Sequence, residues 1–150
     1  MRHIIVVGIL VALVGPLPAA LAQPPAAGGA VFVAYYWRAK PGQLDAYNEY
    51  IRTVAVPIDD DARKAGVFEE VRTVMPGSGI AADWTHLRIF RLKEGLKEGL
   101  KDAAAVQALS AGLDAATARI VPDEAQRKAN SARAAGLRDF VRQEIWIELR

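Results

Sequence analysis

The chain of 150 residues contains no cysteine and only two histidines, His3 and His86. Without cysteine there is no disulfide framework, so packing alone must hold the fold together. A zinc site draws its ligands mainly from cysteine, histidine and carboxylates, and this supply of ligands argues against one. We therefore predict no zinc site, and no motif in the chain points to a cofactor. A carboxylate site for a harder cation stays open.

The chain also lacks an excess of charge of either sign. It has 19 Lys and Arg residues against 17 Asp and Glu residues, which gives a formal net charge of +2. A basic patch or stripe is the usual electrostatic signature of a nucleic-acid-binding protein. The balance therefore gives no reason to expect nucleic acid as a partner.

Residues 1–22 have the three parts of a secretory signal peptide in the right order. Arg2 provides a positive start, residues 4–14 are apolar, and Ala20-Leu21-Ala22 provides a small-x-small cleavage pattern. The apolar stretch is shorter than the ~20 residues that a spanning helix needs. We expect cleavage before Gln23, export to the periplasm or beyond, and no stable membrane anchor afterwards.

The remaining chain is predicted to form one α+β domain over residues 30–150, preceded by a flexible leader at 23–29. Stretches that are β-branched and aromatic, or that alternate between apolar and polar residues, predict strands. Apolar residues at helical spacing predict helices, which Pro57 and Pro122 suit as first-turn residues. The expected strands lie at 30–38, 67–74, 84–92 and 140–149, and the expected helical regions at 43–66 and 103–135.

A short Leu-Lys-Glu-Gly repeat at 92–100 separates the third strand from the second helical region. Its leucines fall every four residues and can share a helical face, but its two glycines weaken a helix. We interpret it as a helical lead-in or a duplicated loop.

The order strand, helix, strand, strand, helix, strand is that of the ferredoxin-like βαββαβ fold. Its helices would cover one face of a four-stranded antiparallel sheet and leave the other face bare. If Leu87 and Ile89 pack on the helices, the bare face carries the alternate residues of the same strand, which are Trp84, His86, Arg88 and Phe90. Because so aromatic a face favours an interface, we expect a homodimer.

Three segments carry a resemblance to a known family: YYWRAKPGQLDAYNEYI from residue 35, WTHLRIFRL from residue 84 and FVRQEIWIEL from residue 140. In topology the chain resembles the dimeric α/β-barrel superfamily, and its opening is similar to antibiotic-biosynthesis-monooxygenase-like domains and their stress-response relatives. The resemblance implies two sheets paired face to face in a dimer. It also implies a function among cofactor-free oxygenases, haem-degrading or haem-peroxidising enzymes, lactone isomerases or uncharacterised members. It assigns no catalytic residue.

His86 is the titratable side chain of the predicted domain whose unperturbed pKa lies near neutrality. It is our candidate catalytic residue, as a general base, a haem ligand or an orienting donor. The alternative is a histidine whose hydrogen bonds are satisfied within the fold or an interface. Because no acidic partner is evident, we favour the structural role; Glu144 is the candidate acid, although its strand should border the first strand and not the third.

The candidate ligand-binding residues are aromatic and basic side chains on the predicted sheet. Aromatic rings can wall a pocket for a flat molecule, and a phenol or guanidinium can hold an oxyanion. The alternative is core and interface packing, where tyrosine and tryptophan are common. The candidates are Tyr36, Arg38, Trp84, Arg88 and Trp146.

The two acidic runs have simpler interpretations than a catalytic or metal site. Asp59-Asp60-Asp61 could gather a hard cation, but carboxylates also favour a helix N-terminus, which explains the triplet. Glu69-Glu70 could supply a base, but charges at a strand edge also prevent edge pairing.

Two functional hypotheses remain. One is a cofactor-independent or haem-linked enzyme acting on a small aromatic molecule. The other is a non-catalytic ligand-binding or stress-related dimer of the same fold.

Overall fold

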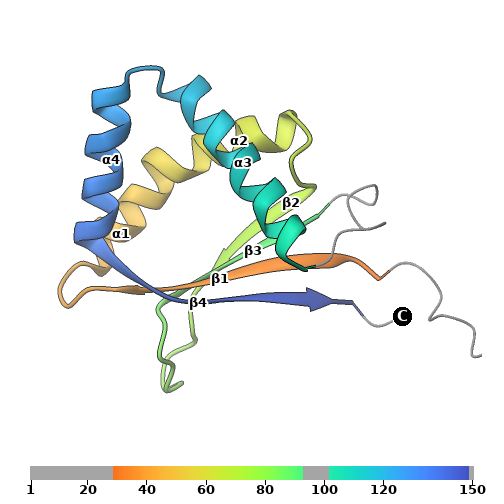
Figure 1. Cartoon of the computed structure of the whole chain (residues 1–150). Coiled ribbons are helices and arrows are strands. Elements are labelled where there is room, and N and C mark those ends of the chain that lie inside the picture. Colours follow the sequence, from red (N-terminus) through yellow and green to blue (C-terminus); the bar gives the residue numbers. More distant parts are fainter. Residues whose placement is uncertain (1–28, 93–101, 149–150) are drawn as a thin grey trace, which may run out of the picture.

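The computed structural model describes residues 29–92 and 102–148, which form one sheet with helices on one of its faces (Figure 1). The connection between the second and third strands extends on the opposite side of the sheet (Figure 1). The elements are, in chain order, β1 (Val31–Ala39), α1 (Leu44–Tyr50), the π-helical segment η1 (Ile51–Ala55), α2 (Val56–Lys64), β2 (Glu70–Val74), β3 (His86–Arg91), α3 (Asp102–Ile120), α4 (Glu124–Leu137) and β4 (Arg138–Ile147).

The four strands pair antiparallel in the order β2-β3-β1-β4. The predicted α+β class, the antiparallel sheet and the pairing of the second strand with the third are confirmed. β4 borders β1 and not β3, as expected. The arrangement is compatible with a ferredoxin-like α+β fold.

The first helical region runs on through α1, η1 and α2 without an intervening loop. Tyr47 and Ile51 of its apolar stripe are buried, whereas Leu44 is 40% exposed. Pro57 lies in the first turn of α2, but the helical region is continuous there, so its missing N–H interrupts the backbone hydrogen bonds directly after the π-helical segment η1. The region ends at Gly66, whose φ of 80° is accessible to glycine at little cost.

The second helical region is α3 followed by α4, joined by a short turn. The side chain of Asp123 accepts a hydrogen bond of 2.6 Å from the backbone N–H of Gln126 and so caps α4. The helix passes the expected stop at Gly136 and ends at Leu137, where β4 begins directly. β2 begins at Glu70, three residues later than predicted.

The main core lies between the sheet and the two helical regions. Phe68, Phe90, Leu92 and Leu109 are each 1% exposed or less, and Phe68 stacks edge-on against Phe90 with ring centroids 5.0 Å apart. A second cluster around Tyr47 joins α1 to α4, and a third lies on the uncovered face around Tyr36 and Leu87.

The predicted faces of the third strand are reversed. His86, Arg88 and Phe90 point toward the helices, and Leu87 and Ile89 pack on the uncovered face. Trp84 does lie on the uncovered face, because the strand begins only at His86. The bend at Thr85, whose N–H donates to the Trp37 carbonyl at 2.9 Å, breaks the alternation between Trp84 and His86.

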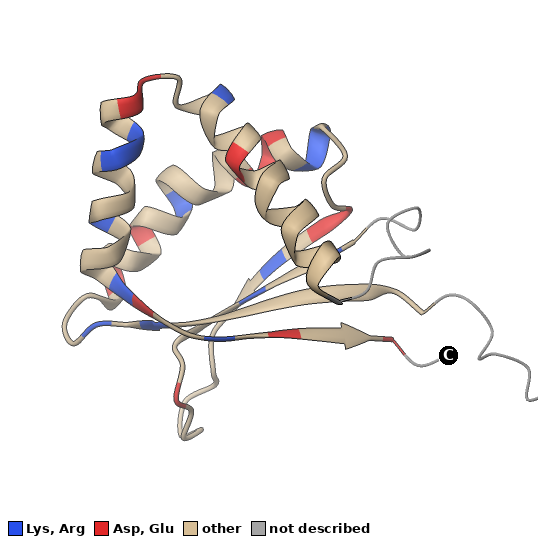
Figure 2. Ribbon diagram, viewed as in Figure 1, with Lys and Arg blue, Asp and Glu red and all other residues tan. Residues whose placement is uncertain are grey.

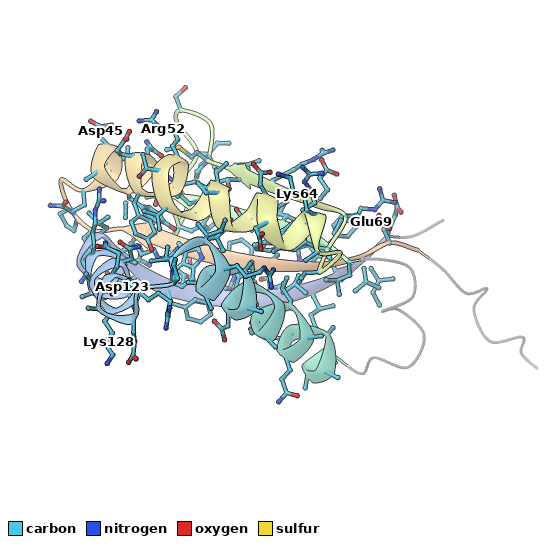
Figure 3. All side chains as sticks on the ribbon, turned by 90° about the horizontal axis from the view of Figure 1, so that it is seen from above. Asp45, Arg52, Lys64, Glu69, Asp123 and Lys128 are labelled. Atoms are coloured by element: carbon cyan, nitrogen blue, oxygen red, sulfur yellow. The ribbon has the colours of Figure 1, made fainter. Side chains whose placement is uncertain are left out.

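Charged residues occur on the helices and on β2, β3 and β4, whereas β1 is nearly free of them (Figure 2). Seen from above, the labelled charged residues of the helices lie at the periphery of the helical layer (Figure 3). No helix in the described part of the chain has the length and apolar character needed to cross a membrane. The predicted signal peptide lies outside the described residues, as do the leader except for Gly29 and the Leu-Lys-Glu-Gly repeat except for Leu92.

Candidate functional site

A cavity of about 230 Å³ lies between the sheet and α3. Its walls are largely aromatic or apolar, and its polar groups come from three different elements. Such a combination of apolar walls with a few placed polar groups is typical of small-molecule sites. The lining residues are Tyr35, Trp37, Arg88, Phe90, Ser110, Leu113, Asp114 and Arg138.

Arg88 reaches the cavity from β3 and forms a buried ion pair with Asp59 of α2. The Arg88 side chain is 11% exposed and the Asp59 side chain 7%. One terminal nitrogen of Arg88 donates to Asp59 Oδ2, whereas its buried Nε has no hydrogen-bond partner among the described residues. Burial raises the pKa of Asp59 to about 6, because loss of hydration outweighs the attraction of Arg88.

Arg138, the first residue of β4, provides a second guanidinium at the cavity. It stacks on the Trp37 ring, with its central carbon 3.6 Å from the ring centroid, and donates a 2.7 Å hydrogen bond to the Tyr47 hydroxyl. Burial raises the pKa of Tyr47, which therefore stays a neutral phenol. These contacts hold the Arg138 side chain in one orientation.

Tyr35 contributes a phenol from β1, and its ring stacks edge-on against Phe90 with centroids 5.9 Å apart. Burial raises the Tyr35 pKa, and a hydrogen bond with Ser110 lowers it in part. The hydroxyl is therefore protonated near neutral pH and can donate to a ligand.

His86 is 1% exposed and does not line the cavity. Its Nε2 lies 2.8 Å from Asn48 Oδ1, and its Nδ1 lies 2.8 Å from Thr85 Oγ1. Because Oδ1 can only accept, Nε2 carries the proton and Nδ1 accepts from the threonine. The Thr85 hydroxyl in turn accepts the Ala39 N–H at 2.7 Å. Burial, assisted by Arg138, lowers the His86 pKa to about 4.

A second polar cluster, the Glu144 network, lies on the uncovered face. Glu144 accepts hydrogen bonds from the Tyr36 hydroxyl at 2.7 Å, the Arg142 Nε at 2.8 Å and the Trp146 indole at 2.9 Å. These donors lower the Glu144 pKa to about 2. Arg142 also bonds Asp83, at 3.0 and 3.1 Å, and thereby ties the β2–β3 connection to β4.

The uncovered face also carries an open hollow of about 370 Å³, larger than the cavity beneath α3. Its floor is apolar, and its rim alternates between acidic and basic side chains. The lining residues are Phe32, Glu70, Arg72, Ile89, Arg91, Trp146 and Glu148.

The predicted ligand-binding residues fall on two faces of the sheet. Tyr36, Trp84 and Trp146 come together around the Glu144 network, with Tyr36 stacked edge-on against both tryptophans. Arg38 lies beside them and donates to the Asp83 carbonyl at 2.6 Å. Arg88 lies on the helix-covered face instead, because of the reversed phase of β3.

Sequence reasoning missed Asp59 as a buried partner of Arg88, as well as the roles of Arg138, Ser110 and Asp114. Helical spacing could have indicated that Asp59 is buried. It lies three residues before Ala62 and eight after Ile51, which are both buried and mark the inward side of the helix. Arg138 had no comparable signal, since it stands at the junction of a helix and a strand.

The described residues do not fit a haem at this site. The cavity is smaller than the ~300–1,000 Å³ typical of ligand pockets, and both ring nitrogens of His86 are engaged. No group of three or more His, Cys, Asp or Glu residues placed to hold a metal ion occurs in the part of the chain that the structure describes.

Comparison with known proteins identifies a distant structural neighbour. No protein-family model matches the chain, and no curated protein matches its sequence. The crystal structure of HapK from Hahella chejuensis superposes with a TM-score of 0.49 and 13% sequence identity, over 79% of this chain and 92% of that chain. A similarity this distant carries no argument about function.

Proposed function

We propose that this protein binds a small aromatic molecule in the cavity between the sheet and α3. The observation that carries the proposal is the pair of guanidinium groups, of Arg88 and Arg138, that border a cavity with aromatic walls. A ligand oxygen that accepts from a guanidinium forms a charge-assisted hydrogen bond, which is stronger than a bond between neutral groups.

The shape and lining of the cavity support a flat ligand with an oxygen-bearing end. Trp37, Tyr35 and Phe90 can stack on a ring, and Arg88 and Arg138 can bind its oxygens. The volume of about 230 Å³ limits the ligand to one or two fused rings in our proposal. His86 is given no part in binding, because its hydrogen bonds are satisfied within the fold.

A blocked cavity tests this function. Ser110→Phe, on the cavity side of α3, should abolish saturable binding of 1-naphthamide and 1-naphthoate, measured by calorimetry. Ala111→Phe adds the same ring to the next residue, which is exposed and does not line the cavity, and should leave binding unchanged. Equal binding by the two variants, or no binding of either compound to the unaltered protein, would refute the proposal.

We also propose that the chain has the ferredoxin-like βαββαβ topology and pairs with a second copy through its uncovered face. The hollow there has an apolar floor, and Trp146, which lines it, is 38% exposed. A two-fold axis can bring Glu70 and Glu148 of one copy against Arg72 and Arg91 of the other.

Light scattering at micromolar concentration should give the mass of two chains. Ile89→Asp, in the floor of the hollow, should shift the mass to that of one chain, whereas Ala111→Asp on the far side of the molecule should not. A single-chain mass for the unaltered protein would contradict the dimer.

We further propose that the protein is exported and that its signal peptide is cleaved before Gln23. N-terminal sequencing of secreted protein should begin at Gln23, and an intact Met1 would contradict this proposal.

Asp59 favours a second candidate function, a cofactor-independent enzyme acting on the same ligand. A carboxyl with a pKa of about 6 can give or take a proton near neutral pH, but Asp59 does not line the cavity and would reach a ligand only after Arg88 moves aside. The two functions differ in one measurement: mass spectrometry of a bound aromatic ligand after prolonged incubation shows a product only if the protein is an enzyme.

A further inference from the structure

The Arg88–Asp59 pair is a structural feature that simple binding of an aromatic ring does not require. Arg88 is both a wall of the cavity and the buried partner of Asp59. One guanidinium therefore faces two possible acceptors, a carboxylate of the protein and any acidic group of a ligand. This inference rests on the proposed binding function and extends it to the chemical class of the ligand.

The two acceptors compete for Arg88 because a buried acidic group needs a neighbouring cation to remain charged. A buried carboxylate that loses its cation is strongly destabilised, since the protein interior replaces little of its hydration. Taking up a proton removes that penalty. We propose that the ligand carries an acidic group that takes Arg88 from Asp59, and that Asp59 gains a proton when the ligand binds.

The surroundings of the pair support this exchange. Asp60 on the same helix disfavours a second negative charge at Asp59, whereas Arg88 is the cation that opposes this effect. From α3, Asp114 borders the cavity and Arg119 is engaged by Asp61 at 2.6 Å. Arg119 is therefore not free to replace Arg88.

Two further groups face Arg88. Arg138 borders the same cavity from β4, so an acidic ligand would meet two guanidinium groups. The Tyr47 hydroxyl, on α1, accepts from Arg138 and stays neutral. Burial already raises the Asp59 pKa to about 6 while Arg88 is in place, so little more is needed for protonation at neutral pH.

Carbon-13 NMR of the free protein provides a test that needs no ligand. The Asp59 carboxyl should titrate between about pH 5 and 7, and the Arg88 Nε resonance should shift with the same midpoint. Asp45→Asn, at an exposed residue of α1, serves as a control that leaves the Arg88–Asp59 pair intact. An Asp59 carboxyl that titrates below pH 5 would overturn the inference, whatever the protein binds.

Calorimetry with two matched compounds then tests the exchange itself. 1-Naphthoate carries the acidic group, and 1-naphthamide has nearly the same shape without the charge. Above the Asp59 titration, uptake of one proton makes the 1-naphthoate affinity fall about tenfold per pH unit, while the affinity for 1-naphthamide stays constant. Titrations in buffers of different ionisation enthalpy should show about one proton taken up for each 1-naphthoate bound at pH 7.5.

Two variants separate the exchange from binding in general. Asp59→Asn should bind 1-naphthoate more tightly at pH 7.5, with no proton uptake and no pH dependence. The double variant Asp59→Asn/Arg88→Met leaves no unpaired buried charge, and its affinity for 1-naphthoate relative to 1-naphthamide should be lower than that of Asp59→Asn, because only Arg138 remains to bind the anion. Binding of both compounds without proton uptake overturns the exchange but keeps the binding function. Binding of neither overturns the binding function, and the inference with it.

Discussion

The pKa values of the charged groups on the two sides of the sheet are shifted by different causes. On the helix-covered face, burial raises the pKa of Asp59 to about 6 and lowers that of His86 to about 4. On the uncovered face, three donors lower the pKa of Glu144 to about 2. Loss of hydration dominates on one side and hydrogen bonding on the other.

This difference separates groups that can exchange protons from groups that stay charged. Asp59 can change its charge at physiological pH, whereas the Glu144 network keeps its charges over the whole range in which proteins are stable. The covered face is therefore the side suited to ligand-linked proton chemistry. The uncovered face offers a fixed pattern of charges and rings, which suits the recognition of a second surface.

Loss of Arg88 should give the largest effect. Arg88→Met leaves Asp59 buried without its cation, and we expect a loss of about 3–5 kcal/mol in the free energy of unfolding at pH 7.5. The loss should shrink at pH 5, where Asp59 is protonated, and the double variant Asp59→Asn/Arg88→Met should recover most of it. Urea unfolding followed by tryptophan fluorescence measures all three proteins. The same loss at both pH values would show that packing, not charge, accounts for the effect.

The pH dependence of stability should reveal two opposing groups. The raised pKa of Asp59 stabilises the fold in acid, and this contribution is lost as the pH rises from about 4 through about 6. The lowered pKa of His86 acts in the other direction, because its contribution is complete above pH 6.5 and is lost as the pH falls to about 4. The two should largely cancel between pH 4 and 6.

Asp59→Asn removes one side of this balance. Its free energy of unfolding should fall by about 3 kcal/mol between pH 7 and pH 4, which is the cost of charging His86, whereas that of the unaltered protein should change little. Urea unfolding at half-unit pH intervals measures the two curves, with Asp45→Asn at an exposed residue of α1 as the control. Parallel curves would mean that Asp59 titrates normally in the fold.

Removal of the imidazole should cost less. His86→Ala leaves the partners at Asn48 and Thr85 unsatisfied, and we expect a loss of about 1–3 kcal/mol in the free energy of unfolding. His86→Gln keeps one donor and one acceptor and should lose less. Binding of 1-naphthamide should persist in both variants. Loss of binding in a variant that folds normally would restore His86 as a functional residue.

The smallest effect tests whether the two faces communicate. Glu144→Gln should leave the His86 pKa unchanged in an NMR titration, because Glu144 bonds Tyr36, Arg142 and Trp146 on the other side of the sheet. A His86 pKa that returns toward 6.5 in this variant would show coupling through the sheet.

The strands and their neighbours could be predicted because alternation and turn residues are local signals. The segment 84–92 showed that it was a strand, but not which side faced inward, because both sets of alternate residues are partly apolar. The deciding feature is the bend at Thr85, which depends on a hydrogen bond to Trp37, 48 residues away in sequence. Such a contact leaves no trace in a local pattern.

The candidate site was harder to predict than the fold for the same reason. Its polar groups come from β3, α2, α3 and the first residue of β4, and each looks ordinary in its own segment. Asp59 was hidden within an acidic triplet whose other two members form ion pairs with Arg63 and Arg119; the helix N-terminus expected there is absent, because α1, η1 and α2 are continuous. Tyr36, Trp84 and Trp146 could be grouped because neighbouring strands bring them together.

The position of β1 has a consequence for how the chain folds during synthesis. β1 is a central strand, and one of its two partners, β4, is the last strand of the chain. At about 5–20 residues per second, translation reaches β4 roughly 5–20 s after β1 has been made. Until then β1 has an unpaired edge, and the sheet cannot be completed.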